Sequence, residues 1–352
     1  FLQDECPTTL VRGILDGDES YSRALWERIG QMGWTATVIP ESYGGLGASY
    51  LDLCVIAEEL GRAVAPVPFS SSVYMATEAL LLAGTEAQKE KWLPKLATGE
   101  VIGTFAISEG SGRPSPANLN AKAVDGMVTG TKIPVPDGDI ADFAVAVTAS
   151  QNGDGASLYL VELDGVERAS VATLDPTRSH AKLTFNDTAA SLMGVEGEGW
   201  TAVEKLLNRA AVLYAWEQVG GSEAALEQAK EYAMGRYAFG RPIAGFQAIK
   251  HKLANVYVKN TLARSNGYYG AWALSTDAPE LPIAGATARV SGTQAYYFAS
   301  KENIQTHGGM GFTWEFDCQF YYRRSKLLSV TIGSESWWQD KLITAIERGH
   351  AA

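Results

Sequence analysis

The amino-acid sequence predicts a multidomain α+β protein: an N-terminal α-helical domain, a middle β-barrel or β-sandwich domain, and a C-terminal four-helix bundle. Two observations predict this fold class. Apolar residues recur with a helical period up to about residue 100, with a strand period up to about residue 194, and with a helical period again after that. The chain has 352 residues, more than one ordinary core accommodates, so two or three packed units are expected. We therefore predict domains at residues 1–100, 101–194 and 195–352.

The first region is predicted to contain helices joined by turns. Leu25, Ile29 and Met32 recur at i, i+4 and i+7, which is the spacing of one helix face. Residues 86–100 predict a further helix closed by Gly99, because glycine adopts the left-handed conformation of a helix C-cap without a steric penalty. Segments rich in Gly, Pro and Ser separate these helices and predict turns.

The second and third regions differ in the length of their elements. Short runs such as VIGTFAIS, DFAVAVTA and SLYLVEL are separated by Gly, Asp and Pro clusters and predict strands. An Asp-Gly pair at residues 125–126 predicts a hairpin. Together these strands predict a small barrel or sandwich. The third region begins with a nearly continuous helical pattern over residues 200–236 and contains about four long helices.

The composition restricts the classes of partner. The net charge is −11 at pH 7, which argues against nucleic acid and anionic membrane surfaces. No apolar run approaches the roughly 18–20 residues of a membrane span. Three widely spaced cysteines, Cys6, Cys54 and Cys318, predict neither a disulfide framework nor a zinc site. No metal site is expected, and a reducing cytoplasm is the simplest location.

Two segments of the third region have residue types suited to a phosphorylated ligand. Arg236, Arg241 and Gln247 gather at a predicted helix junction, and two guanidinium groups there can hold a phosphate through paired hydrogen bonds. A plain corner between helices with solvated arginines is the alternative. The second segment, residues 305–312, has three glycines within four positions. Such glycines allow backbone N–H groups to approach a phosphate or ribose closely, although they equally suit a helix C-cap.

Together the two segments resemble the acyl-CoA dehydrogenase family. That family has an Arg-x-x-Phe-Gly-x-x-Ile-x-x-x-Gln element followed by Gln-x-x-Gly-Gly-x-Gly-Phe, and this chain has RYAFGRPIAGFQ and QTHGGMGF. The resemblance extends over nearly the whole chain, including PESYGGLGASYLDLCVIAEELGRA and YYRRSKL. It implies an FAD bound between subunits, with its ring on the β-domain of one chain and its pyrophosphate and adenosine on the helical bundle of a neighbour. It also implies an acyl-CoA substrate, a glutamate base and an electron-transfer flavoprotein as acceptor.

The half of the FAD site that a neighbour supplies is present in the sequence. The resemblance implies that the cofactor-binding residues are Arg236, Phe239, Gln247, Gln305, Thr306, His307, Gly308 and Gly309. His307 is also a candidate general base, although a lone histidine near a helix cap is more often structural.

The half that holds the flavin ring departs from the family pattern. The family usually has Thr-Glu-Pro-x-x-Gly-Ser-Asp where this chain has SEGSGRPS at residues 108–115. Pro134 replaces an aromatic residue that covers the ring, and Pro136 replaces a threonine that hydrogen-bonds it. Proline offers neither an aromatic face nor a donor.

The catalytic base is also absent from its expected positions. Ile332 stands where the family has its glutamate, and Asn208 occupies the alternative position on an earlier helix. Neither side chain accepts a proton at neutral pH. Glu335 lies one helical turn beyond Ile332, about 5 Å along a helix axis, and would act as base only if the segment rewound.

These observations predict a subunit without a catalytic base in a heteromeric acyl-CoA dehydrogenase. A related chain would supply the glutamate and the ring platform in an α₂β₂ assembly that shares FAD across unlike interfaces, and its substrate would be an acyl-CoA such as a sterol side-chain thioester. Two alternatives stay open: a stand-alone flavoenzyme of the desulfinase or monooxygenase type, and a flavin-free scaffold protein.

Overall fold

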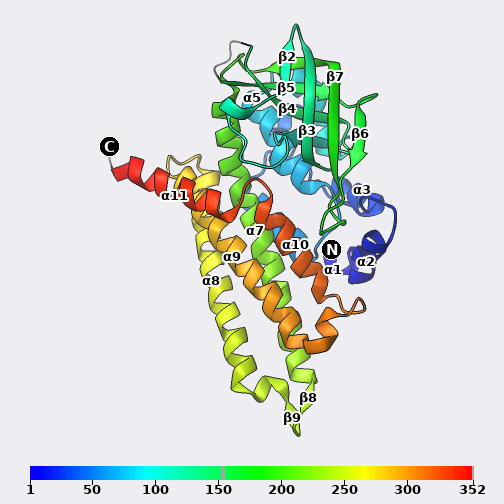
Figure 1. The fold of residues 1–352 in the computed structure, drawn as a ribbon, viewed down its shortest axis with the longest axis vertical. Helices are drawn as coiled ribbons and strands as arrows, with labels where there is room; N and C mark the ends of the chain where they lie inside the picture. The colour runs from blue at the N-terminus through cyan, green and yellow to red at the C-terminus, as the bar shows by residue number, and fades with distance from the viewer. Residues whose placement is uncertain (152–154, 351–352) are drawn as a thin grey trace. The chain divides into compact units, whose positions relative to one another are not determined.

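The computed structural model describes residues 1–151 and 155–350 and confirms the predicted fold class (Figure 1). Helices precede and follow a β-domain, and the chain forms two compact units. The bundle unit comprises Phe1–Arg12, Tyr50–Ala65 and Ala211–Ala352, and the sheet unit comprises Gly13–Ser49 and Pro66–Ala210. The predicted boundaries near residues 100 and 194 stay a prediction.

The N-terminal helices begin and end at local signals in the sequence. Thr85 and Gln88 form a capping box at the start of one helix, and Gly99 ends it with φ +72°, which confirms the predicted C-cap. Leu25 and Ile29 are buried, but Met32 is 53% exposed because its helix ends at Gln31 and Met32 is only its C-cap. The elements are α1 (Leu2–Glu5), α2 (Thr8–Asp16), α3 (Arg23–Gln31), η1 (Glu41–Tyr43), α4 (Tyr50–Arg62), the π-helix η2 (Ser70–Thr77), α5 (Glu78–Ala83) and α6 (Glu86–Thr98).

The strands close into a barrel. Their order is β1-β4-β2-β3-β7-β5. Because β4 also pairs with β5, the strands from β4 to β5 form a closed ring, and β6 pairs with β7 outside it. Asp125 and Gly126 both have positive φ between β2 and β3, as a two-residue hairpin turn requires, and the predicted hairpin is confirmed. The strands are β1 (Gly103–Ala106), β2 (Lys122–Val124), β3 (Met127–Pro136), β4 (Phe143–Ala149), β5 (Ala156–Glu162), β6 (Glu167–Ser170) and β7 (His180–Met193), and η3 (Pro116–Asn118) precedes β2.

Long helices form the C-terminal region. They are α7 (Gly199–Gly235), α8 (Gln247–Ser275), α9 (Leu281–His307), α10 (Cys318–Val330) and α11 (Glu335–His350); β8 (Tyr237–Ala238), β9 (Arg241–Pro242), η4 (Ile243–Gly245) and η5 (Gly308–Phe312) connect them. Glycines allow a close crossing of two helices in the bundle unit. A methyl group on Gly61 or Gly220 would lie 1.9 or 1.8 Å from a backbone oxygen of the facing helix, so α4 and α7 touch backbone to backbone.

Charged side chains join the same helices. Arg264 of α8 binds Glu58 of α4 at 2.6 Å and Glu223 of α7 at 2.7 Å, and Arg62 also binds both carboxylates. Among the described residues no helix is long and apolar enough to cross a membrane, and no group of His, Cys, Asp and Glu could hold a metal ion. Cys6, Cys54 and Cys318 are buried free thiols.

Candidate functional site

The two glycine- and arginine-bearing segments lie at the same end of the bundle unit, although about 70 residues separate them in the sequence. Three contacts between the neighbouring helix ends place them there. The rings of Tyr232 on α7 and His307 on α9 stack with centroids 4.1 Å apart. Asn303 donates to Gln228 at 2.7 Å, and Lys252 of α8 pairs with Glu302 of α9 at 3.4 Å. The helices therefore bring the two predicted halves of one ligand site together.

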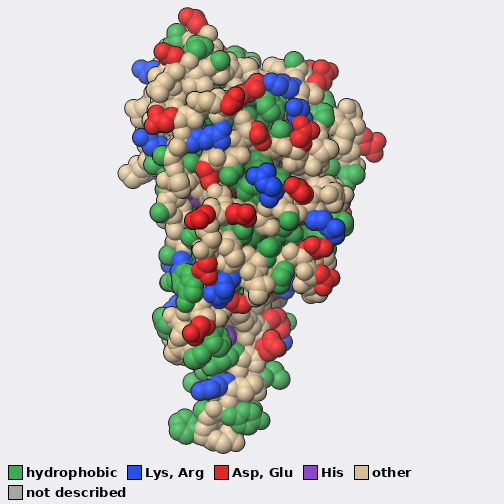
Figure 2. All heavy atoms as spheres, turned by 90° about the vertical axis from the view of Figure 1, so that its right-hand side faces the viewer, with side chains coloured by type: hydrophobic (Ala, Val, Ile, Leu, Met, Phe, Trp, Pro, Cys, Tyr) green, Lys and Arg blue, Asp and Glu red, His purple; other side chains and the backbone are tan. Residues whose placement is uncertain are grey.

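The segment that follows α7 is a short hairpin. The Ile243 N–H donates to the carbonyl of Arg236 at 2.8 Å. Phe239 occupies the tip with φ +53° and is 96% exposed, and hydrophobic side chains gather at this tip of the molecule in Figure 2. The Arg241 guanidinium lies 4.2 Å above the ring of Phe246. Arg236 and Gln247 are exposed on either side of the turn, so both side chains are available to a ligand or a second chain.

The end of α9 divides its predicted binding residues into two groups. Gln305, Gly308 and Gly309 are exposed. The Thr306 hydroxyl is buried and donates to the Glu302 carbonyl at 2.7 Å. His307 is buried as well, with Nδ1 2.9 Å from the Asn303 carbonyl oxygen, and burial lowers the pKa of its imidazole. The side chains of Thr306 and His307 are therefore buried and hydrogen-bonded within the chain, unlike those of the exposed group.

The glycines after α9 leave the backbone open. Gly308 has φ +61° and ψ −138°, close to the region that essentially only glycine occupies. A Cβ atom on either Gly308 or Gly309 would meet no atom within 4 Å. The space beside this backbone can therefore receive a ligand atom in place of a side chain.

In the sheet unit, polar groups near the predicted ring site are committed to one another. Lys132 is completely buried, and its Nζ lies 2.6 Å from Glu109 Oε1. Glu109 also accepts the N–H groups of Asn120 and Ala121 at 2.6 and 3.1 Å. Burial would raise the pKa of Glu109, but the hydrogen bond and charge of Lys132 hold it below its ordinary value.

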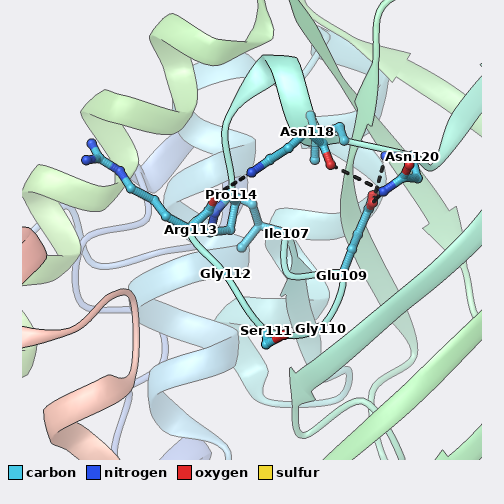
Figure 3. A pocket seen from close by; sticks show the side chains of 10 residues that line it. Ile107, Glu109, Gly110, Ser111, Gly112, Arg113, Pro114, Asn118 and Asn120 are labelled. Carbon is cyan, nitrogen blue, oxygen red and sulfur yellow. Dashed lines mark hydrogen bonds between the residues drawn. The ribbon is translucent and has the colours of Figure 1, made fainter.

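The backbone beside this ion pair is also hydrogen-bonded internally. Ile133 N–H donates to the Ser108 carbonyl, and Gly110 N–H donates to the Ile133 carbonyl, both at 2.8 Å. The remaining pocket is small, about 150 Å³, with Asn120 against Glu109 and Arg113 directed away from it (Figure 3). Ligand pockets usually span about 300–1,000 Å³. By itself, this pocket offers little space for a planar tricyclic ring.

The end of β3 is fixed in a similar way. The Thr104 hydroxyl donates to the carbonyl of Pro136 at 2.6 Å. The next residue, Asp137, is buried and accepts from Ser71 and Ser179, and burial raises the pKa of its carboxyl group against the opposing charge of Arg178. Side chains of neighbouring segments thus fix the end of the strand that carries both replacement prolines through hydrogen bonds.

The expected base position lies in a tight turn between α10 and α11. Ile332 has φ +57° and Gly333 has φ +115°, and a Cβ on Gly333 would lie 1.6 Å from the ring of Trp337. Glu335 begins α11 and accepts hydrogen bonds from Gln294 and Gln339 at 2.7 and 3.0 Å. The Glu335 carboxylate therefore already accepts two hydrogen bonds at the start of α11, and rewinding the turn would break these bonds.

Arg289, which the sequence analysis missed, fixes this turn. Its guanidinium is buried and donates to the carbonyls of Leu328 and Thr331, the latter at 2.7 Å, and to Gln218 Oε1 at 2.7 Å. Burial lowers the pKa of Arg289 to about 10. The available sequence signal was a single arginine within the small, apolar run PIAGATARVSG.

Asn208, the alternative base position, lies on α7 and is only 9% exposed. Among the described residues its Oδ1 atom has no hydrogen-bond partner. A buried amide oxygen without a partner is costly, so this position is compatible with a polar group supplied from outside the chain.

Comparisons with known proteins identify the family of the chain. The description "Acyl-CoA dehydrogenase, N-terminal domain" matches residues 1–100, and "Acyl-CoA dehydrogenase, C-terminal domain" matches residues 197–343. The chain is 34% identical to acyl-CoA dehydrogenase IpdE2 of Mycobacterium tuberculosis over 90% of this chain and 84% of that protein. It is 31% identical to IpdE2 of Mycolicibacterium smegmatis over 90% and 85% of the two chains. A solved structure of the Tcur3481-Tcur3483 steroid ACAD superposes with a TM-score of 0.90 at 26% identity and covers 100% of this chain and 96% of that one. The chain therefore belongs to the acyl-CoA dehydrogenase family.

Proposed function

We propose that this chain is a subunit without a catalytic base in a heteromeric FAD-dependent acyl-CoA dehydrogenase. Acyl-CoA dehydrogenases are FAD flavoproteins that oxidise acyl-CoA thioesters. The observation that carries the proposal is an asymmetry: the ligand groups at the end of the bundle unit are exposed, whereas Ile332 and Asn208 occupy the two possible base positions. The chain's contribution is then to hold the pyrophosphate and adenosine parts of FAD for a partner.

The donor groups at the bundle end fit an FAD diphosphate. Arg236 can form paired, charge-assisted hydrogen bonds with phosphate oxygens. Gln247 opens α8, whose first turn has no side-chain cap, and a helix N-terminus favours anions. The end of α9 favours cations instead. Gln305 and the open backbone of Gly308 and Gly309 therefore suit the neutral ribose and adenine better than the phosphates.

Side chains around this site also support a neighbouring chain. Tyr237, Phe239 and Phe312 are 65%, 96% and 80% exposed at the same end of the bundle unit. Large apolar groups exposed together mark interaction surfaces. We assign this end to contact with a catalytically competent paralogue in an α₂β₂ assembly.

The partner would supply the chemistry that this chain lacks. It provides the glutamate that removes the α-proton of the acyl-CoA and the platform for the flavin ring. A bound FAD would supply the hydride acceptor for the β-carbon of the substrate, with an electron-transfer flavoprotein as the oxidant of the reduced cofactor. The similarity to a steroid ACAD supports a CoA thioester of a sterol side chain as the substrate class.

Flavin content tests the proposal directly. The chain is co-expressed with its paralogue, and the ratio of flavin absorbance to each chain is measured in the purified complex. Arg236→Ala should lower this ratio, because it removes charge-assisted bonds to the pyrophosphate. Lys230→Ala is the matched control: it removes an exposed cation of α7, six residues before Arg236, whose ion pair among the described residues is a local one with Glu227. Equal flavin content in the two variants contradicts the trans role.

The isolated chain separates the alternatives. Under the proposal it is colourless or weakly yellow and does not turn over acyl-CoA. Full flavin occupancy with turnover would establish a stand-alone flavoenzyme instead. A complex that forms with the paralogue but carries no flavin in any preparation would establish a scaffold role.

A further inference from the structure

Arg12 contacts a loop of the bundle unit that lies 302 to 305 positions away in the sequence. Its Nη1 atom donates to the carbonyl of Trp314 at 2.6 Å, and its Nη2 atom donates to the carbonyl of Glu315 at 3.3 Å and to Asp317 Oδ1 at 2.5 Å. The guanidinium also lies 5.0 Å from the centroid of the Phe320 ring on α10. One side chain therefore holds three polar groups of the segment between η5 and α10.

The three acceptors match an arginine better than a lysine. A planar guanidinium carries five N–H donors in a fixed fork, so it can serve two successive carbonyls and a carboxylate at once. Its position is otherwise unfavourable, because Asp317 is the N-cap of α10 and the start of a helix repels a cation. The Asp317 carboxylate offsets that repulsion. The guanidinium is therefore placed to fix the loop, not to stabilise the helix that follows it.

The N-terminal segment that carries Arg12 belongs to the bundle unit and is packed against it. Leu2, Cys6 and Val11 are buried. The Cys6 thiol donates to the carbonyl of Ala63, just after α4, at 3.8 Å. Arg12 therefore reaches the loop from a fixed support.

The loop that Arg12 holds continues directly from the open backbone of the proposed FAD site. Gly308, Gly309 and Gly311 lie in η5, only a few residues before the carbonyls that accept from the guanidinium. Glycine loses more conformational freedom on ordering than any other residue. A segment with three glycines in four positions therefore depends on contacts at its ends to keep one conformation.

Weaker contacts act on the same loop. The Phe316 ring meets the rings of Tyr232 and His307 edge-on, with centroids 6.2 and 5.7 Å apart. The Cys318 thiol donates to the Gly311 carbonyl at 3.5 Å, and a thiol is a weak donor. Hydrogen bonds from a guanidinium are charge-assisted and stronger. Loss of the guanidinium would thus remove bonds that these contacts do not replace.

We propose that Arg12 is a positioning residue, which holds the backbone of Gly308 and Gly309 in the conformation that receives FAD. This inference rests on the proposed function and adds to it a residue that acts through the loop. A loop that is already ordered pays less conformational entropy when a ligand binds. Removing the Arg12 side chain should therefore weaken FAD binding although the groups assigned to the cofactor are retained.

Hydrogen exchange of the isolated chain, measured by mass spectrometry, tests the contact without flavin. In Arg12→Ala the amides of residues 308–317 should exchange about tenfold faster, a factor equivalent to about 1.4 kcal/mol of local stability. Arg62→Ala is the matched control, because Arg62 also pairs with a carboxylate of another element, Glu223 at 3.1 Å, and the two arginine side chains are 24% and 31% exposed. It should leave the exchange of this loop unchanged.

FAD binding to the complex with the paralogue tests the positioning role. Arg12→Ala should raise the dissociation constant of FAD by about tenfold, whereas Arg62→Ala should leave it unchanged. Arg12→Lys keeps the charge beside Asp317 but loses the fork, so it should recover part of the affinity. Circular dichroism and thermal melts show that each variant is folded and compare the overall stabilities.

The outcomes separate this inference from the proposed function. Unchanged loop exchange in Arg12→Ala overturns the inference. Faster exchange with wild-type FAD affinity also overturns it, because the loop would then not govern cofactor binding. An equal loss of FAD affinity in Arg62→Ala does the same, since general destabilisation would explain both variants. Absence of flavin from the wild-type complex instead contradicts the proposed function, and the exchange of the isolated chain still decides whether Arg12 orders the loop.

Discussion

Substitutions of the adjacent glycines Gly308 and Gly309 should separate the effect of this backbone on stability from its effect on ligand binding. Gly308 has φ +61° and ψ −138°, whereas Gly309 has no positive φ. A Cβ on either residue would meet no atom within 4 Å. An alanine at either position therefore creates no steric overlap within the chain, and only its backbone conformation and its effect on a ligand differ.

The magnitudes differ accordingly. Gly308→Ala forces an L-residue into a nearly glycine-only conformation, at a cost of about 1–3 kcal/mol. In units of about 150–250 residues each kcal/mol lowers Tm by roughly 2–4 °C, so the melting temperature should fall by about 2–12 °C. Gly309→Ala should leave Tm unchanged or raise it slightly, because alanine reduces the entropy of the unfolded chain.

The flavin readout should differ from the thermal readout. In the complex with the paralogue, Gly309→Ala places a methyl group where the exposed backbone would approach FAD, so flavin retention should fall although the fold is intact. Thermal melts of the isolated chain and flavin-to-chain ratios of the complex measure the two effects. A wild-type Tm for Gly308→Ala would refute the backbone argument. Full flavin occupancy in Gly309→Ala would refute close approach of the cofactor to this loop.

Three further predictions concern the remaining parts of the site. Lys132→Met leaves the largely buried Glu109 carboxylate without its cation and should lower the free energy of unfolding by about 3–5 kcal/mol, which thermal melting measures. Adding Glu109→Gln should recover part of that loss. If the destabilisations of the two single variants simply add in the double variant, the pairing is contradicted. Burial lowers the pKa of His307, so its stabilising contribution is present above the ordinary histidine value of about 6.5 and is lost as pH falls below that value through the lowered pKa of the folded state; His307→Gln should flatten the change in Tm between pH 7.5 and 5.5, and an unaltered slope would exclude this histidine as its source. Ile332→Glu alone should produce no acyl-CoA oxidation in a flavin-linked dye assay, because the polar groups near the predicted ring site stay hydrogen-bonded to one another. Substantial turnover would show that the prolines of β3 have little effect on activity.

The features that could be predicted from the sequence depend on local chemistry. Asp125 and Gly126 adopt the positive φ values that their hairpin requires, and Gly99 ends α6, because both signals act within a few residues. The predicted helix extends one residue too far, to Met32, since hydrophobic spacing does not locate the last helical residue. The structure of the turn at Ile332 was not predictable. Arg289 holds it through Leu328 and Thr331, which lie 39 and 42 positions away, and nothing in the local sequence specifies those acceptors.

The two halves of the expected FAD site differ in how their polar groups are used. In the sheet unit, Lys132 is bound to Glu109, and the Pro136 carbonyl accepts from Thr104. Near the expected base, Glu335 is bound to Gln294. A ligand that recruited these groups would first have to replace those hydrogen bonds, and a buried group left unsatisfied costs about 1–3 kcal/mol.

At the bundle end the situation is reversed. Arg236, Gln247 and Gln305 are exposed, so binding there displaces water rather than internal contacts. A ligand that recruited the groups of the sheet unit would therefore have to replace internal hydrogen bonds, whereas a ligand of the exposed groups at the bundle end would not. A sequence that had simply lost its enzyme activity would give no reason for this difference. A subunit that presents one half of a cofactor site to a competent partner needs the bundle end accessible and has no requirement for the other half.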